Sequence, residues 1–138
     1  MYIYVEKRSG RKVFVRSRYG WFNAELGEDF GVDEKTRFCT DAELDFPEEI
    51  DFNAFCVTNQ KSFNIMNAGS STVICGIVIS YEEGDDGSGV VCLRYDLDIF
   101  QILVRNDNRF QNIIGKNVEV KVCRIVLYNP NIFPIKVL

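Results

Sequence analysis

The feature that most constrains the fold is the strict alternation of apolar and polar residues in short segments of the 138-residue chain. Residues 2–6 and 12–16 carry isoleucine or valine at every second position, and residues 8–11 (Arg-Ser-Gly-Arg) lie between them. A period of two with glycine in the connection is typical of an antiparallel β-hairpin. Residues 21–24 (Trp-Phe-Asn-Ala) predict a third strand.

The second half of the chain contains further β-branched runs. These predict a short strand at 55–57, a hairpin of 73–81 with 90–96, one long strand at 118–128 and a terminal edge strand at 135–138. The hairpin has an acidic, glycine-containing connection at 82–89, which predicts a long tip.

Two stretches are less regular. Residues 97–105 fit a buried strand or a buried helix equally well, with Asp96 or Asp98 as a helix cap, and a short helix is expected at 108–114 before Gly115. Segment 25–51 is expected to be a long connection that holds a short strand at 36–40 and a short helical turn at 45–49.

These patterns predict a single α+β domain, mainly antiparallel β, in the form of a twisted small barrel or sandwich with one or two short helices. It would consist of a basic N-terminal hairpin (1–24), an acidic connection (25–51) and a β-rich core (52–138). The element order of that core is also found in small barrels of the OB type, which is an analogy of pattern.

Charge is segregated along the chain. Residues 1–24 hold six basic residues and one acid, a net charge of +5, whereas residues 25–51 hold eleven acids and two basic residues, a net charge of −9. The remaining eight acids and eight basic residues cancel, which leaves −4 overall. The two segments either face each other in the fold or present their charge to partners.

The chain has no histidine, which excludes imidazole acid–base catalysis, serine and cysteine nucleophiles that need histidine, and zinc sites with a histidine ligand. Its five cysteines have apolar neighbours and form no CxxC pair, so we expect buried thiols in a reducing compartment. No signal-like run opens the sequence, and the uncharged stretch 62–81 is too polar to span a membrane. We therefore predict a cytoplasmic protein without membrane contact, cofactor or bound metal.

The most suggestive surface is the basic hairpin. If its isoleucine and valine side chains face the core, aromatic and cationic side chains share the opposite face. Flat rings and cations are what a nucleotide or a single-stranded nucleic acid requires, although a sequence pI of 4.9 is unusual for such a protein. Candidate ligand-binding residues are Tyr4, Lys12, Phe14, Arg16, Arg18, Tyr19 and Trp21, with Arg94 and Arg124, which lie inside apolar runs, as second choices.

The acidic segment suggests a different partner. Its carboxylates are spaced by single aromatic and aliphatic residues, and they could engage the basic surface of another protein or simply form a solvated loop. The candidate partner-binding residues are Asp41, Glu43, Asp45, Glu48, Glu49 and Asp51.

A third reading is enzymatic. Glu119 and Lys121 on one strand, with Asp96, Asp98 or Asp107 upstream, are similar to the metal site of nucleases of the PD-(D/E)xK type. Alternating E-x-K is, however, typical of any exposed strand face, and the helix that follows in those nucleases is missing here.

The leading prediction is a non-catalytic intracellular binding protein, of inhibitor or adaptor type, that recognises another protein. The alternative is a nucleotide or single-stranded nucleic-acid binder that uses the N-terminal face. A carboxylate–metal nuclease is the second alternative. The sequence leaves the oligomeric state open.

Overall fold

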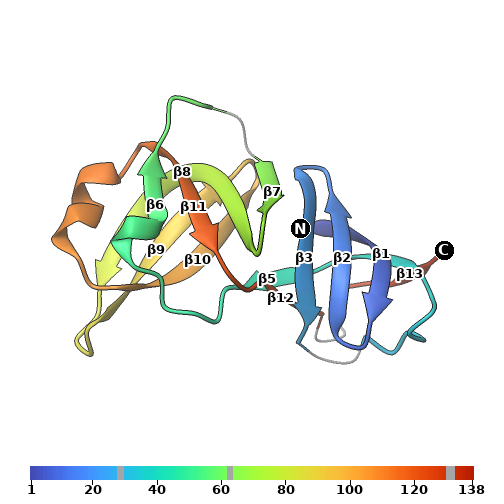
Figure 1. Ribbon diagram of the computed structural model, residues 1–138. Helices are drawn as coiled ribbons and strands as arrows, with labels where there is room; N and C mark the ends of the chain where they lie inside the picture. Colours follow the sequence, from blue (N-terminus) through green and yellow to red (C-terminus); the bar gives the residue numbers. More distant parts are fainter. Residues whose placement is uncertain (28–29, 62–63, 130–132) are drawn as a thin grey trace.

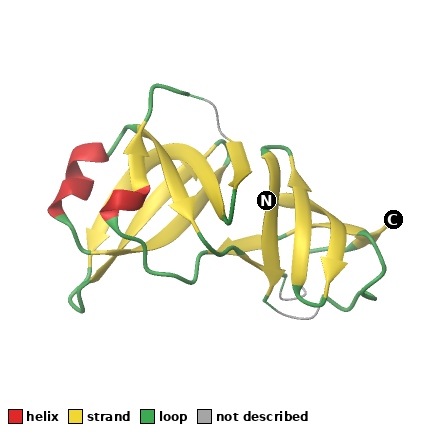
Figure 2. Ribbon diagram, in the orientation of Figure 1, coloured by secondary structure: helices red, strands yellow, loops and turns green. Residues whose placement is uncertain are grey.

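The computed structural model describes residues 1–27, 30–61, 64–129 and 133–138. The chain forms two β-sheets, which lie side by side in Figure 1. A seven-stranded sheet has the order β13-β4-β1-β2-β3-β12-β5, and a six-stranded sheet has the order β10-β9-β8-β11-β6 with β7 paired to β8. Within the described residues, helix is confined to two short 3-10 segments, drawn in red in Figure 2. The predicted fold class, mainly antiparallel β with short helical segments, is therefore confirmed.

The seven-stranded sheet consists of β1 (Tyr2–Ser9), β2 (Lys12–Ser17), β3 (Gly20–Leu26), β4 (Phe38–Asp41), β5 (Glu43–Asp45), β12 (Val126–Tyr128) and β13 (Lys136–Val137). The other sheet consists of β6 (Phe55–Val57), β7 (Asn64–Ala68), β8 (Ser71–Glu83), β9 (Ser88–Tyr95), β10 (Asp98–Arg105) and β11 (Asn117–Val122). The 3-10 segments are η1 (Phe52–Ala54) and η2 (Asn108–Ile113).

The N-terminal strands form the meander that the alternation predicts. Ile3, Val5, Val13 and Val15 are all buried, so one face of β1 and β2 supplies the core of this sheet. Gly10 has φ +62° in the β1–β2 turn, a conformation that glycine adopts at little cost. All the neighbouring strand pairs of this sheet are antiparallel except β12 with β3, which is parallel.

The second sheet resolves the stretch that the sequence left open. Residues 98–105 form a strand, because Phe100, Ile102 and Val104 point into the core while their odd-numbered neighbours point outward. The predicted β8–β9 hairpin is also present, with a tip that is shorter than expected because both strands extend into the 82–89 connection. The expected short helix is η2, capped by the Asp107 side chain, which accepts a hydrogen bond from the Arg109 backbone N–H.

The predicted long strand 118–128 is wrong. The chain leaves the six-stranded sheet after β11 and enters the other sheet as β12, where Val126 lies opposite both Asp45 and Glu25. Arg124 stands in the break and binds the Glu25 carboxylate, while the Ile125 carbonyl accepts a hydrogen bond from the Glu25 N–H. These tertiary contacts divide a run that is continuous in its local pattern.

Three smaller predictions also need correction. The helical turn at 45–49 is absent, because Phe46 is buried and Ile50 bridges to Val104 of β10; the helical turn comes later, as η1. The strand expected at 36–40 begins two residues later, as β4. Strand β7 was not expected at all, and Asp96 does not cap a helix but occupies the β9–β10 turn with φ +56°.

The apolar core runs through both sheets. An aromatic column joins them: the Phe46 and Phe100 ring centroids lie 5.8 Å apart, those of Phe100 and Tyr95 5.5 Å apart, and those of Tyr95 and Tyr19 4.3 Å apart. At the far end of the second sheet, Phe110 of η2 packs against further aromatic rings. Large buried rings of this kind contribute much of the apolar stabilisation of a small domain.

The two sheets also meet where β3 begins (Figure 1). The Ile65 N–H of β7 donates a hydrogen bond of 3.1 Å to the Tyr19 carbonyl, and the Asn23 N–H donates to the Asn67 carboxamide oxygen at 3.2 Å. Gly20 lies at this crossing with φ +139°, and a Cβ there would overlap the Ile65 carbonyl oxygen. The sheets can approach this closely only because the residue has no side chain.

The prediction that all the cysteines are buried is correct only in part. Cys39 and Cys75 are buried and Cys92 is half-buried, whereas Cys56 and Cys123 are exposed. All five are free thiols. Cys56 is exposed because it lies on β6, the end strand of its sheet, and Cys123 because it stands in the break between β11 and β12.

Candidate functional site

The outer face of β1, β2 and β3 carries most of the ligand-binding residues predicted from the hairpin. Because side chains alternate across a strand, Tyr4, Lys12, Phe14 and Arg16 point away from the core that Val13 and its apolar neighbours fill. The strand register places Arg16 between Tyr4 of β1 and Trp21 of β3. We call this surface the aromatic face.

A β-bulge adds a cation to the aromatic face. The β1–β2 register shifts between Val5 and Lys7, so that Lys7 lies opposite Phe14. A bulge of this kind re-aims the side chains that follow it. Without the shift, the acidic Glu6 would be opposite Phe14; instead Glu6 forms an ion pair with Arg16.

The rings and cations of the aromatic face contact one another. Trp21 is 56% exposed, and its ring makes an edge contact with Phe14 at 6.1 Å between centroids. The Arg16 guanidinium carbon lies 5.3 Å from the Trp21 ring centroid and 5.9 Å from that of Tyr4. These contacts fix the orientation of the rings while leaving most of the indole accessible to a ligand.

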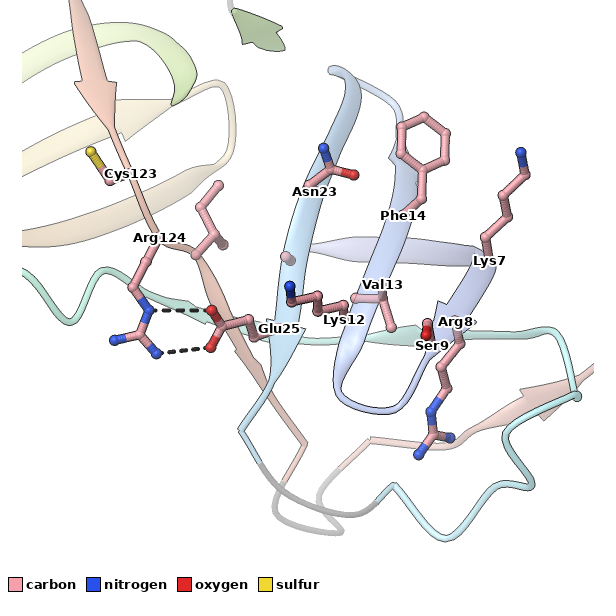
Figure 3. A pocket seen from close by; sticks show the side chains of 12 residues that line it. Lys7, Arg8, Ser9, Lys12, Val13, Phe14, Asn23, Glu25, Cys123 and Arg124 are labelled. Atoms are coloured by element: carbon pink, nitrogen blue, oxygen red, sulfur yellow. Dashed lines mark hydrogen bonds and ion pairs between the residues drawn. The ribbon is translucent and has the colours of Figure 1, made fainter. Parts of the chain in front are cut away.

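A hollow of about 460 Å³ opens at one end of the aromatic face (Figure 3), and Lys7, Lys12 and Arg124 bring cations to its lining, whereas the Arg8 guanidinium points away from it and donates to the Gly10 and Val32 carbonyls. The Arg124 guanidinium binds Glu25 through two hydrogen bonds, of 2.8 and 3.3 Å. These bonds lower the pKa of Glu25 below its ordinary value, so this carboxylate stays charged. Arg124 and Glu25 neutralise each other, so Lys7 and Lys12 leave the hollow positively charged.

A second hollow, of about 390 Å³, lies at the other end of the aromatic face and reaches β7. Phe14 lines both hollows, and Trp21 lines the second together with Met66 and Asn67. The aromatic pair of Phe14 and Trp21 therefore stands between a cationic hollow and one that is mainly apolar.

Three of the predicted ligand-binding residues do not belong to the aromatic face, although Tyr19 contributes to the lining of the second hollow. Tyr19 is a core residue: burial and a hydrogen bond from its hydroxyl to Asp98 raise its pKa to about 12. Arg18 is exposed, but it pairs with Asp96 at 3.2 Å and stacks on the Tyr19 ring. Arg94, expected within an apolar interior, is exposed on the outer face of the other sheet.

Arg124 is the one second-choice residue that joins the site. Its side chain is about half exposed, and it reaches the cationic hollow from the break between β11 and β12.

The acidic segment does not cover the basic hairpin as a unit. Glu49 and Asp51 pair with Arg105 of β10, and Glu49 also accepts a hydrogen bond from the Ser88 hydroxyl. The bond from Ser88, and then those from Arg105, lower the pKa of Glu49. Asp41 lies 4.0 Å from the N-terminal amine.

The other three predicted acids, Glu43, Asp45 and Glu48, are exposed. Glu43 and Asp45 belong to β5, the end strand of its sheet. They line a hollow of about 360 Å³ that Asp98 and Ile99 of β10 close on the other side.

The carboxylates proposed for a nuclease are engaged separately. Asp98 binds Tyr19 and the N-terminal amine, Asp107 binds Arg109, and Asp96 binds Arg18. Glu119 lies opposite Cys75 and Cys56 in the strand register. Among the residues that the structure describes, no three cysteine or acidic side chains gather in a way that could hold a metal ion.

Sequence reasoning missed three residues of the site: Lys7, Met66 and Asn67. Nothing in the sequence marks the bulge that turns Lys7 outward, and the last two residues belong to a strand that was not predicted. The outward direction of Arg94 could have been predicted from the sequence, because Arg94 lies between Leu93 and Tyr95 in the alternating pattern, and both of those side chains point inward.

A scan against models of protein families finds no match for this chain, and a search of curated proteins finds no similar sequence. In the described parts of the chain, no helix is long and apolar enough to cross a membrane.

Proposed function

We propose that this chain is a non-catalytic binding protein that holds single-stranded nucleic acid on its aromatic face. The observation that carries the proposal is the exposed Trp21 ring, held by Arg16 and Phe14 between two hollows, one of which is lined by Lys7, Lys12 and Arg124. Bases stack on aromatic side chains without regard to sequence, and each stacked base contributes about 1–3 kcal/mol.

The same face provides groups for the phosphates. Lys7 and Lys12 are long cations on the rim of the cationic hollow, close to Phe14, on which a base can stack. A strand with unpaired bases can place a base on Trp21 or Phe14 and a neighbouring phosphate near Lys12. A duplex keeps its bases stacked inside and can use only the cations. We therefore favour single-stranded over double-stranded nucleic acid.

The local charge makes this binding compatible with an acidic chain. The net charge of −4 arises from residues 25–51, in which Glu49 and Asp51 pair with Arg105 of the other sheet and Glu25 is the acid that lines the cationic hollow. Electrostatic attraction of a polyanion depends on the surface that it meets and on screening within about 10 Å, rather than on the total charge.

The proposal is tested by fluorescence anisotropy with a labelled oligothymidylate at low salt. We expect saturable binding that weakens as salt rises, with a slope of about −2 in a plot of log K against log salt if three cations meet phosphates. Trp21→Ala should weaken binding at every salt concentration, whereas Lys12→Glu should also flatten the slope.

A matched control separates the aromatic face from general charge. Arg94→Glu changes the net charge by the same amount as Lys12→Glu but lies on the outer face of the other sheet. We expect this variant to bind almost as the wild type does. Absence of binding at low salt, or equal losses in Arg94→Glu and Lys12→Glu, would contradict the proposal.

A second candidate function is recognition of a basic segment of another protein, of the inhibitor or adaptor type. It is favoured by the hollow between β5 and β10, where Glu43, Asp45 and Asp98 surround the apolar Leu44 and Ile99. Charge complementarity of this kind steers association and sets specificity.

The second candidate is tested by affinity capture with Glu43→Lys/Asp45→Lys and, as control, Glu82→Lys/Glu83→Lys on β8. A protein captured by the wild type and the control but lost in the β5 variant would support it, and identical captured sets would contradict it. Five free thiols suit a reducing environment, and we propose a cytoplasmic location on that ground.

A further inference from the structure

Exposed apolar side chains gather on the outer face of β8, β9 and β10, away from the aromatic face. Ile99 of β10 is 59% exposed, Leu103 41% and Ile79 of β8 39%. The strand register aligns the outward residues in three rows: Ile77, Arg94 and Ile99; Ser80, Cys92 and Gln101; Glu82, Val90 and Leu103. Exposed apolar surfaces with a polar rim usually mark an interface. We call these three rows the outer patch.

Charge is distributed unequally over the outer patch. The first row holds a cation, Arg94, and the third row holds an acid, Glu82, with Glu83 next to it in the chain. Within the part of the chain that the structure describes, neither Arg94 nor Glu82 has an ion-pair partner. A surface with opposite charges at its two ends is complementary to a copy of itself turned by 180°.

We infer that the outer patch is an interface between two copies of this chain, related by a two-fold axis that runs along the middle row. Rotation about that axis places each strand over its own copy in the opposite direction. Ile99 then packs on the partner's Leu103, and Arg94 comes within reach of the partner's Glu82. The apolar contact on β10 and the ion pair between β9 and β8 are each formed twice, as the symmetry of an isologous interface requires.

The free edge of β10 is partly occupied, which favours association through the outer patch over strand pairing along that edge. The Ile50 N–H donates to the Leu103 carbonyl, and the Ile50 carbonyl accepts from the Arg105 N–H, so the C-terminal half of the β10 edge is occupied. The N-terminal half faces β5 across the acidic hollow. A second copy can therefore not extend the six-stranded sheet past β10 without displacing these segments.

The outer patch is three strands (about 10 Å) wide and about 13 Å long along β9, so its area is well below the roughly 800 Å² that each partner buries in a standard interface. We therefore expect a reversible dimer that forms in the micromolar to millimolar range. Such a dimer is measured by sedimentation equilibrium of the full chain across that range.

The first test replaces an apolar side chain of the outer patch. Ile99→Asp should keep the chain monomeric, because it places a carboxylate against the partner's apolar Leu103 in both copies of the contact. The control is Val57→Asp on β6, also apolar and 50% exposed but outside the outer patch. It should dimerise as the wild type does. A monomeric wild type throughout the range, or a dimer that Ile99→Asp leaves intact, would overturn the inference.

The second test uses the charge complementarity between the outer patch and a second copy of it. Arg94→Glu and Glu82→Arg should each weaken the dimer at least tenfold, because each puts like charges together at both ends. An equimolar mixture of the two variants should recover association, since each cation then meets an acid on the other chain. Circular dichroism confirms that each variant is folded. Failure of the mixture to recover association would contradict a two-fold axis along the middle row.

Discussion

Replacing Gly20 by alanine should destabilise the fold more than a turn glycine normally would. Gly20 has φ +139°, a region that costs a residue with a Cβ about 1–3 kcal/mol. The added Cβ also meets the Ile65 carbonyl, which belongs to the backbone of β7 and has to move. Such a shift strains the hydrogen bond from the Ile65 N–H to the Tyr19 carbonyl, worth about 1 kcal/mol. The expected loss is about 3 kcal/mol.

The assay is urea unfolding followed by fluorescence, for which the chain is well suited because it has a single tryptophan, Trp21, next to the substituted position. With a slope of about 1–3 kcal/mol per molar urea, a loss of this size lowers the midpoint by between 1 and 3 M. Gly10→Ala is the matched control, since Gly10 also has a positive φ but nothing within 4 Å of an added Cβ.

The control should lose only the cost of a left-handed conformation, about 1 kcal/mol. Equal midpoints for Gly20→Ala and Gly10→Ala would refute the argument that the two sheets meet through the Gly20 backbone. A normal midpoint for Gly20→Ala would refute it as well.

Two further predictions concern aromatic residues. The pKa of Tyr19 is raised to about 12 by burial first and then by its bond to Asp98, so the folded state holds the proton more tightly than the unfolded chain. This stabilisation is complete below pH 10 and disappears as the pH rises towards 12. The wild type should therefore lose on the order of 1–2 kcal/mol of unfolding free energy between pH 9 and pH 11, and Tyr19→Phe should not lose this amount. Unfolding midpoints at the two pH values measure the difference. Phe110→Ala should cost about 3–5 kcal/mol in urea unfolding, because the ring is fully buried among Phe52, Phe55 and Tyr81; a cost below about 1 kcal/mol would mean that η2 is not packed on the core.

The parts of the fold that the sequence predicted are those governed by neighbouring residues. The β1–β2 hairpin follows from alternation and a glycine turn, and both are local. The break between β11 and β12 was missed because residues 122–127 form an almost continuous apolar run, and the reason for the break is the distant Glu25. Strand β7 was missed because its five residues show no clear alternation, and they form a strand only through pairing with β8.

The candidate site shows the same limit. Tyr4, Phe14 and Arg16 could be placed on one face of the hairpin from the period of two alone, whereas Trp21 was included because it follows the hairpin in the sequence. Tyr19 follows the hairpin in sequence and was grouped with them, but the turn at Gly20 directs its ring into the column with Tyr95. Whether an aromatic residue in a turn is exposed or buried depends on the second sheet, which the local pattern does not describe.

The measurement that tests the central claim most directly is a titration of Trp21 fluorescence with an unlabelled single-stranded oligonucleotide, beside a duplex of the same sequence, at low salt. Stacking of a base on the exposed indole predicts quenching by the single strand that reverses on addition of salt, and much weaker quenching by the duplex. Unchanged Trp21 fluorescence at saturating oligonucleotide, or equal quenching by the duplex, would contradict the assignment of the aromatic face as a single-strand binding surface.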